Sequence, residues 1–164
     1  MSITVSYNSQ LTVVETLEGP YVSSSDSTVT TNGLNTTVER TASTTQPVTK
    51  YSAFLKALSG GTGTIDLTSL PDVGGNAGAV TFSGLKLQFV KFINPSTNAN
   101  AITIAKGASN GHTGLGSSFS ITLQPGGEYL WKGNDNTTDV GGSDKTFDLS
   151  GTGTQSLQVE LVAG

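Results

Sequence analysis

Apolar and polar residues alternate over several short segments of the chain. In the last of these segments, Leu157, Val159 and Leu161 alternate with Gln158 and Glu160. This spacing puts every second side chain on the same side, which is typical of a β-strand with one buried face. Other apolar segments, separated by Gly, Pro and Asn turns, occur at 65–69, 80–93, 101–105, 119–123, 128–132 and 147–149. Many short strands with tight turns predict an all-β protein, a β-sandwich of jelly-roll-like type.

The alternation changes phase in one of these segments. Leu85, Leu87 and Phe89 occupy alternate positions, whereas Val90 and Phe92 continue with the opposite parity. A single residue inserted into a strand shifts its faces in this way, and so does burial of both faces. We therefore expect either a β-bulge near Phe89 or a strand that is covered on both sides.

The first part of the chain is more polar and rich in threonine. Ile3–Tyr7 and Leu11–Leu17 are predicted as a first pair of strands. Within Thr28–Arg40, the dipeptide Asn32-Gly33 predicts a type I′ hairpin, because both positions tolerate a positive φ. Its flanking residues are only moderately apolar, so we place this hairpin either at the surface or against a neighbouring subunit.

Tyr51–Leu58 is the one segment that suggests a helix. Phe54, Leu55 and Leu58 have helical i, i+1, i+4 spacing, although a strand remains the alternative for so short a run. We expect at most this one short helix. The chain is accordingly divided into N-terminal strands or an arm at 1–58, packed on or extending from the core, and a β-sandwich core at 59–164.

Charge and cysteine content exclude several classes of partner and site. Only 12% of the residues are charged, the net charge is −4, and no basic stripe occurs, which argues against nucleic acid and anionic membranes as partners. The absence of cysteine rules out disulfides and thiolate zinc sites. The first residues lack the basic and apolar regions of a signal peptide, and no apolar run approaches the length of about 18 residues expected for a membrane helix. We expect synthesis and assembly in a host cytoplasm.

The polar segment 133–145 contains the only metal-ligand candidates. Asp135, Asp139 and Asp144 lie close together in sequence, and carboxylates are ligands that calcium prefers. Their spacing does not match an EF-hand loop, and the glycine and terminal glutamate of that motif are missing. We favour a solvated loop without metal over a calcium site.

The other candidate residues are His112, for catalysis, and Tyr129 with Trp131, for sugar binding. His112 is the only histidine and lies between glycines in Asn110–Gly114, where we predict a solvent-exposed loop residue rather than a catalytic one. Tyr129 and Trp131 share one face of a predicted strand, and we assign them to the core in preference to a sugar-stacking platform. The sequence thus predicts a protein that is not an enzyme and needs no cofactor.

Three segments resemble core strands and turns of small structural proteins of tailed bacteriophages: Leu87–Pro95, Phe119–Glu128 and Leu157–Gly164. In those proteins a strand ends in Asn-Pro, a Leu-x-Pro-Gly turn precedes an aromatic strand, and the last strand finishes the chain. The resemblance covers roughly residues 80–164. It implies a component of the virion, either a capsid cement (decoration) protein or a part of the tail or fibre.

The capsid cement protein is the leading expectation from this resemblance. Such a protein binds the major capsid protein on the outside of the shell as a homo-oligomer, here expected to be a trimer, and clamps neighbouring subunits together. The polar N-terminal segment is expected to be the bridging arm, since a flexible arm can become ordered on binding. The alternative is a tail or fibre component, or a glycan-binding module that uses Tyr129, Trp131 and calcium in the Asp135–Asp148 loop.

Overall fold

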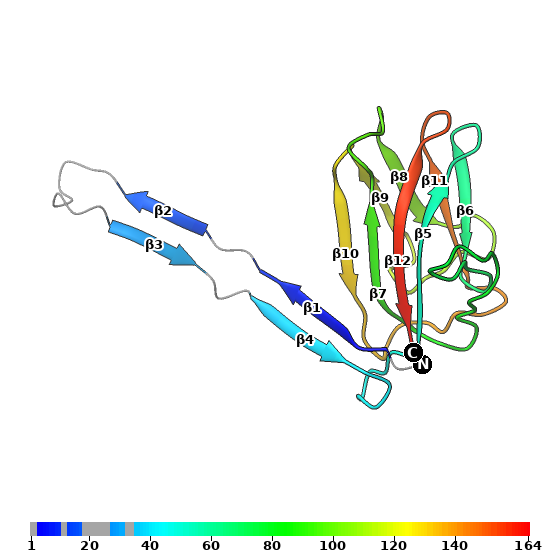
Figure 1. Cartoon of the computed structure of the whole chain (residues 1–164), viewed down its shortest axis with the longest axis horizontal. Coiled ribbons are helices and arrows are strands. Elements are labelled where there is room, and N and C mark those ends of the chain that lie inside the picture. The colour runs from blue at the N-terminus through cyan, green and yellow to red at the C-terminus, as the bar shows by residue number, and fades with distance from the viewer. Residues whose placement is uncertain (1–2, 11–12, 18–26, 32–34) are drawn as a thin grey trace.

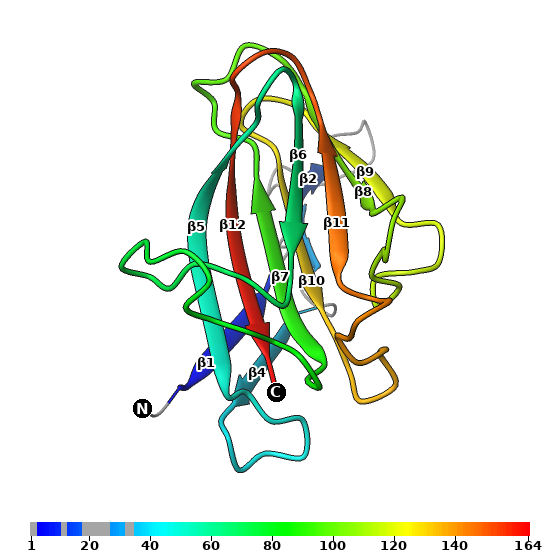
Figure 2. The same ribbon diagram turned by 90° about the vertical axis from the view of Figure 1, so that its right-hand side faces the viewer.

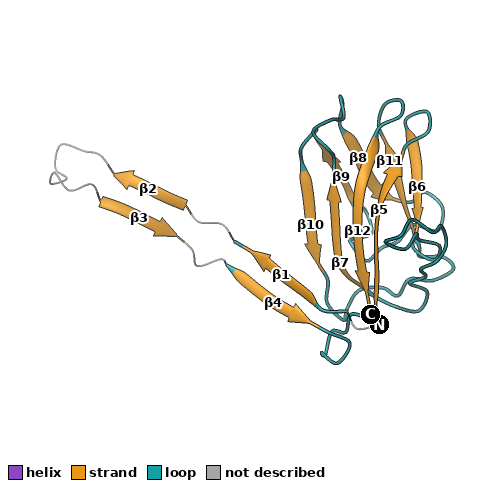
Figure 3. Cartoon of the chain, viewed as in Figure 1, coloured by secondary structure: helices purple, strands orange, loops and turns teal. Residues whose placement is uncertain are grey.

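The part of the chain that the structure describes forms strands and loops only. The structure is a computed structural model, and it describes residues 3–10, 13–17, 27–31 and 35–164. In these residues there are twelve β-strands and no helix (Figure 3), which confirms the all-β prediction. The described part also contains no helix of the length and apolarity that crossing a membrane requires.

Eight strands form a sandwich of two antiparallel sheets (Figures 1 and 2). The strands are β5 (Lys50–Ala57), β6 (Thr62–Asp66), β7 (Leu87–Ile93), β8 (Ile102–Lys106), β9 (Ser120–Leu123), β10 (Glu128–Lys132), β11 (Thr146–Ser150) and β12 (Ser156–Ala163). One sheet has the order β10-β7-β12-β5 and the other β6-β11-β8-β9. The first of the eight strands thus pairs with the last, the second with the seventh, the third with the sixth and the fourth with the fifth. This is the strand order of a jelly roll, as the sequence predicts.

Strand β5 corrects the expectation of a helix at Tyr51–Leu58. All eight of its residues pair with β12, from Lys50 opposite Ala163 to Ala57 opposite Ser156. The side chain of Leu55, which made the spacing look helical, is 61% exposed on the sheet surface instead of being buried. Since β5 belongs to the sandwich, the sandwich begins near residue 50 and not at residue 59.

The core lies between the two sheets and is largely aromatic at its centre. Phe147 of β11 packs edge-on against Phe92 of β7 at 6.0 Å and against Phe119 at 6.1 Å between ring centroids. Alternate residues of β12, which are Leu157, Val159 and Leu161, are fully or almost fully buried in the same cluster. The alternation of apolar and polar residues in β12 therefore corresponds to one face of the strand in the core and one face outside it.

A tight turn joins β9 to β10 and is of type II. Pro125 occupies its second position, and Gly126 follows with φ of +82°, a value that favours glycine. The turn closes with a hydrogen bond of 2.8 Å from the Gly127 N–H to the Gln124 carbonyl. This geometry sends the chain from one sheet of the sandwich to the other.

The four N-terminal strands form a two-stranded antiparallel ribbon, called the ribbon below. Its first ladder pairs β1 (Val5–Ser9) with β4 (Thr36–Arg40), and its second pairs β2 (Val13–Leu17) with β3 (Ser27–Thr31). Figure 1 shows the β1–β4 ladder starting at the base of the sandwich and the β2–β3 ladder pointing away from it. We call the β1–β4 ladder the foot and the β2–β3 ladder the distal ladder.

The ribbon also corrects how the N-terminal strands pair. The sequence paired Ile3–Tyr7 with Leu11–Leu17, whereas the strands in these segments each pair with a partner from the other side of the ribbon. Asn32-Gly33 lies outside the described residues. The described strands on either side of it, β3 and β4, pair with β2 and β1 respectively.

The foot covers one end of the outer face, meaning the side of the β10-β7-β12-β5 sheet that is turned away from the other sheet. Ile3, Val5 and Tyr7 pack on a second apolar cluster of Val48, Phe89 and Val162. The rings of Tyr7 and Phe89 stack at 5.7 Å. Strand β7 is therefore buried on both of its faces at this end.

A β-bulge accompanies this double burial. Phe89 lies opposite Val162 of β12, and Leu87 lies opposite Ala163, so Gln88 has no partner residue on β12. The insertion turns Leu87 towards the core cluster and Phe89 towards the foot. Both explanations that the sequence offered for the phase change near Phe89 are therefore correct.

Candidate functional site

Arg40 holds the foot to the sandwich. Arg40 is the last residue of β4 and the only arginine in the sequence. Its side chain is buried. Nη1 donates to Gln88 Oε1 at 2.5 Å, and Nη2 donates to the carbonyl of Gly133 at 3.0 Å. The guanidinium carbon also lies 4.9 Å from the centre of the Phe89 ring. The β-bulge at Gln88 is thus also part of the binding site of the Arg40 side chain, since the inserted residue supplies a hydrogen-bond acceptor.

The groups in direct contact with the Arg40 guanidinium, on Gln88, Gly133 and Phe89, are neutral. Burial lowers the pKa of Arg40, and the electrostatic attraction of Asp135 acts in the opposite direction. Arg40 makes no ion pair within the described residues. Arginine tolerates such a site because its guanidinium is weakly hydrated and stays charged at any physiological pH. Sequence reasoning missed Arg40; the available signal was a lone arginine at the end of a polar strand in a chain with few charges.

A groove of about 450 Å³ opens where the foot meets the outer face. One wall is formed by six consecutive residues, 3–8, and none of the residues that line the groove belongs to β4. Consecutive residues of a strand point to opposite sides, so a wall made of all of them is the backbone edge of the strand. The floor and the other wall consist of Tyr51, Phe89, Lys91, Leu130, Glu160 and Val162.

Large apolar side chains are exposed on the outer face beyond the foot. Leu55 is 61% exposed, Leu130 is 40% exposed and Tyr51 is 36% exposed. Burial and the nearby Glu160 carboxylate together raise the pKa of Tyr51. Single exposed apolar residues are common on proteins, whereas three on one face beside a groove are a feature that this surface shares with protein-interaction surfaces.

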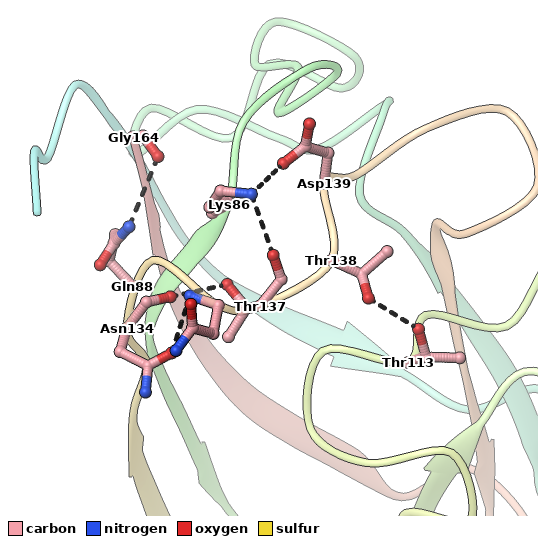
Figure 4. Close-up of polar contacts among 9 residues, drawn as sticks. Lys86, Gln88, Thr113, Asn134, Thr137, Thr138, Asp139 and Gly164 are labelled. Atoms are coloured by element: carbon pink, nitrogen blue, oxygen red, sulfur yellow. Dashed lines mark hydrogen bonds and ion pairs between the residues drawn. The ribbon is translucent and has the colours of Figure 1, made fainter.

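The three aspartates of segment 133–145 do not gather around one point. Asp139 forms an ion pair with Lys86, whose Nζ lies 2.5 Å from Oδ1 and also donates to the Thr137 carbonyl (Figure 4). Asp144 is engaged elsewhere, with Thr113 and His112. Within the described residues, no group of three or more His, Cys, Asp or Glu side chains has the geometry to hold a metal ion.

His112 corrects a prediction, because its side chain is fully buried and not exposed on a loop. Its Nδ1 lies 2.5 Å from Asp144 Oδ1, and its ring packs edge-on against Phe147 at 5.7 Å. Asp144 is held in turn by the backbone N–H and the hydroxyl of Thr113, at 2.9 and 2.6 Å. Gly114 leaves the necessary room, since a Cβ there would lie only 2.4 Å from His112 Nε2.

The His112–Asp144 pair resembles part of a catalytic triad without the nucleophile. Nε2, which would face the serine of a triad, is buried and has no hydrogen-bond partner within the described residues. Burial lowers the pKa of His112, and Asp144 opposes this effect. A protonated ring would add an N–H at Nε2 without an acceptor, so we assign the neutral ring with its proton on Nδ1. This arrangement links the 110–116 loop to β11.

Tyr129 and Trp131 point into the sandwich and pack against its core. Tyr129 lies between Phe92 and Phe119, at 6.4 and 5.6 Å between ring centroids, and burial raises the pKa of its hydroxyl. Trp131 is half-buried, and its ring lies so close to Gly133 that a Cβ there would come within 2.6 Å. The two rings thus form part of the core and not an exposed platform.

The loop that follows β10 borders a shallow polar hollow of about 310 Å³. Thr113 and Thr138 face each other across it with their hydroxyls 3.0 Å apart, and Asn134 closes a local turn through Asn136 N–H (Figure 4). These side chains mainly satisfy each other. The hollow therefore offers less to a partner than the groove at the foot.

Comparisons with known proteins give no relative. No protein-family model, curated protein or solved structure matches the chain.

Proposed function

We propose that the chain is a non-enzymatic structural protein of a virus particle, a cement protein that binds the major capsid protein and bridges neighbouring subunits on the outside of the shell. The observation that carries this proposal is the ribbon. A two-stranded arm that leaves a jelly roll and points away from it is suited to reach a neighbouring subunit (Figure 1). Jelly rolls are common in viral capsid proteins, which agrees with the proposal, although a fold alone does not define a function.

The distal ladder needs a partner for physical reasons. A two-stranded hairpin is at best marginally stable in water. Among the described strands, each strand of the distal ladder has a neighbour on one side only, which leaves the backbone N–H and C=O groups of its outer edge without a strand partner there. Addition to a strand of another protein satisfies these groups and gives affinity through main-chain hydrogen bonds.

The foot turns this contact into a clamp. Arg40 and the stacked Tyr7 and Phe89 rings fix the base of the ribbon on the sandwich. A protein bound to the distal ladder is thereby connected, through the foot, to a protein bound to the sandwich. The low charge content also keeps the desolvation cost of close subunit packing small. Two subunits of a shell bound in this way separate only if one of these contacts breaks.

The test uses a variant without the distal ladder. Ser9 and Thr36 face each other in the foot, so replacing residues 10–35 with Asn-Gly closes the foot with a two-residue hairpin turn. The matched control is Val73→Ser in the full chain, since Val73 is 66% exposed in a loop outside the ribbon. Both variants should unfold like the parent when followed by the fluorescence of Trp131.

The parent and the control are mixed with shells that lack the protein and co-sedimented, and bound copies are counted by mass spectrometry. We expect saturation at a fixed ratio to the major capsid protein and a higher melting temperature of the shell. The shortened variant should bind at least about tenfold more weakly. Absence of binding by the parent at micromolar concentration, or equal binding of the shortened variant, would refute the proposal. Binding to tails instead of shells would move the protein to the tail or fibre.

A further inference from the structure

His112 Nε2 departs from the rule that buried polar atoms are paired. Within the part of the chain that the structure describes, no other buried side-chain nitrogen or oxygen lacks a hydrogen-bond partner. Native proteins contain few such atoms, and each one calls for a physical explanation. A proton added at Nε2 would find no acceptor, because Gly114 lies directly against this atom and the ring packs edge-on against Phe147. The site therefore accepts a neutral ring and opposes a charged one.

His112 and Thr113 join two loops that are far apart in the sequence. Both residues belong to the loop 107–119, between β8 and β9, and both contact Asp144 of the loop 133–145, between β10 and β11. The carboxylate of Asp144 lies 2.5 Å from His112 Nδ1 and accepts the N–H and the hydroxyl of Thr113 at 2.9 and 2.6 Å. We call these contacts of His112 and Thr113 with Asp144 the latch.

Acid between about pH 7 and pH 5 reaches the interior of the protein at the latch. Of the buried residues that the structure describes, only Arg40 and His112 have titratable side chains, and arginine keeps its charge throughout this range. Asp144 is the charged group that faces His112. Charged side chains of the neighbouring segments interact elsewhere: Lys145 with Asp66, Asp148 with Thr64 and the Ala108 N–H, Asp139 with Lys86, and Asp135 with Arg40, while Lys106 is exposed.

We propose that the latch is an acid-sensitive switch, in which a proton taken up by His112 Nε2 releases the loop 107–119 from Asp144 and uncovers the edge of Phe147 while both sheets stay paired. Once released, the charged ring is hydrated, whereas in the closed site its new N–H has no acceptor. Strand pairing does not depend on this loop, because β8 pairs with β9 and β11 through residues 102–106 alone.

Main-chain hydrogen bonds also hold the loop. The N–H groups of Lys145 and Thr146 donate to the Asn110 carbonyl at 2.7 and 2.9 Å, and the His112 N–H donates to the Thr146 carbonyl at 2.9 Å. Opening breaks these bonds, so the open form is a minor one at neutral pH. Hydrogen exchange detects such minor open forms.

The test is hydrogen exchange of the isolated protein followed by mass spectrometry, because the switch does not depend on shell binding. Peptides from 107–119 and from β12 are compared at about pH 7 and pH 5, with each rate divided by the intrinsic rate at that pH. We expect the loop to exchange about three- to thirtyfold faster at pH 5, since each pH unit below the ordinary pKa of about 6.5 shifts the opening at most about tenfold. Addition of urea to about 1 M should leave the loop rate unchanged and raise the β12 rate, because only global unfolding exposes much surface.

Three asparagine variants separate the roles of the residues. His112→Asn keeps an N–H near the position of Nδ1 and cannot titrate, so the acceleration by acid should vanish. Asp144→Asn keeps an acceptor for the Thr113 N–H and removes the carboxylate that opposes the effect of burial on the pKa of His112, so the acceleration should extend to lower pH. Asp139→Asn is the matched control in the same loop, where the side chain contacts Lys86, and should keep the pH profile of the parent.

Two results would overturn the switch at once: the same urea dependence for the loop and β12, or an acceleration by acid that survives in His112→Asn. If His112→Asn does not fold, the parent and the other two variants still decide. A parent loop that exchanges equally at both pH values, or identical pH profiles for Asp144→Asn and Asp139→Asn, would reject the inference.

Discussion

Replacing Arg40 with alanine should loosen the foot and destabilise the whole fold. The guanidinium makes two hydrogen bonds, to Gln88 Oε1 and to the Gly133 carbonyl, and it covers the ring of Phe89. Alanine removes all three contacts. It also leaves two acceptors, one on Gln88 and one on Gly133, in a region from which the side chain had excluded water.

The size of the effect follows from these contacts. A hydrogen bond to a charged group contributes about 1.5–3 kcal/mol, and the stacking on Phe89 adds about 0.5–1 kcal/mol. The burial of a cation without a counter-ion opposes both, and this cost disappears in the variant. We therefore expect Arg40→Ala to lower the free energy of unfolding by about 2–4 kcal/mol, well below the sum of the contacts.

Urea unfolding followed by the fluorescence of Trp131 measures this loss, because Trp131 is the only tryptophan and lies in the sandwich. A double-mutant cycle with Gln88→Ala isolates the main hydrogen bond, for which we expect a coupling of about 1–3 kcal/mol. Lys132→Ala is the control, since Lys132 also lies over a ring of the foot, that of Tyr7, but is exposed. A loss of less than about 0.5 kcal/mol for Arg40→Ala, or an additive cycle, would refute the assignment of Arg40 as the anchor.

Two buried polar residues give further predictions. Because burial lowers the pKa of His112 below that of the unfolded chain, the folded protein binds fewer protons, and stability should fall as the pH drops through about 6.5, by at most about 1.4 kcal/mol per pH unit. His112→Phe should abolish this component of the pH dependence of urea unfolding while losing the contact to Asp144, and an unchanged pH profile would contradict the assignment. Asn94→Ala should cost about 2–4 kcal/mol, because the buried Nδ2 donates to the Leu123 carbonyl at 2.8 Å, whereas the exposed Asn136→Ala should cost less than about 0.5 kcal/mol in the same assay. Equal losses for the two asparagines would show that the amide of Asn94 does not bind the turn to β9.

Local sequence pattern was sufficient wherever burial follows strand alternation. Leu157, Val159 and Leu161 predict the inner face of β12, and the structure places all three in the core. The Pro125-Gly126 turn is likewise encoded locally, since proline sets one φ and glycine permits the positive one that follows. These signals were enough for an all-β sandwich of jelly-roll type.

Pattern failed where a residue's environment is set by distant parts of the chain. Leu55 looks helical beside Phe54, yet β12 fixes this segment as a strand and leaves Leu55 on the surface. His112 sits between glycines, as loop residues do, but Asp144 and Phe147 enclose it from more than thirty residues away. Neither contact leaves a trace in the local sequence. The same holds for Arg40, whose acceptors on Gln88 and Gly133 lie far along the chain.

The two ladders of the ribbon differ in what they contribute to the fold. Without the foot, Phe89 and Val162 would face solvent, and burying each such side chain is worth about 1.5–3 kcal/mol. The foot is therefore part of the stable fold, and loss of residues 3–9 should be destabilising. The distal ladder, in contrast, points away from the sandwich (Figure 1). On the proposed function, changes beyond Ser9 and before Thr36 should alter shell binding with little effect on folding, so the shortened variant tests function and not stability.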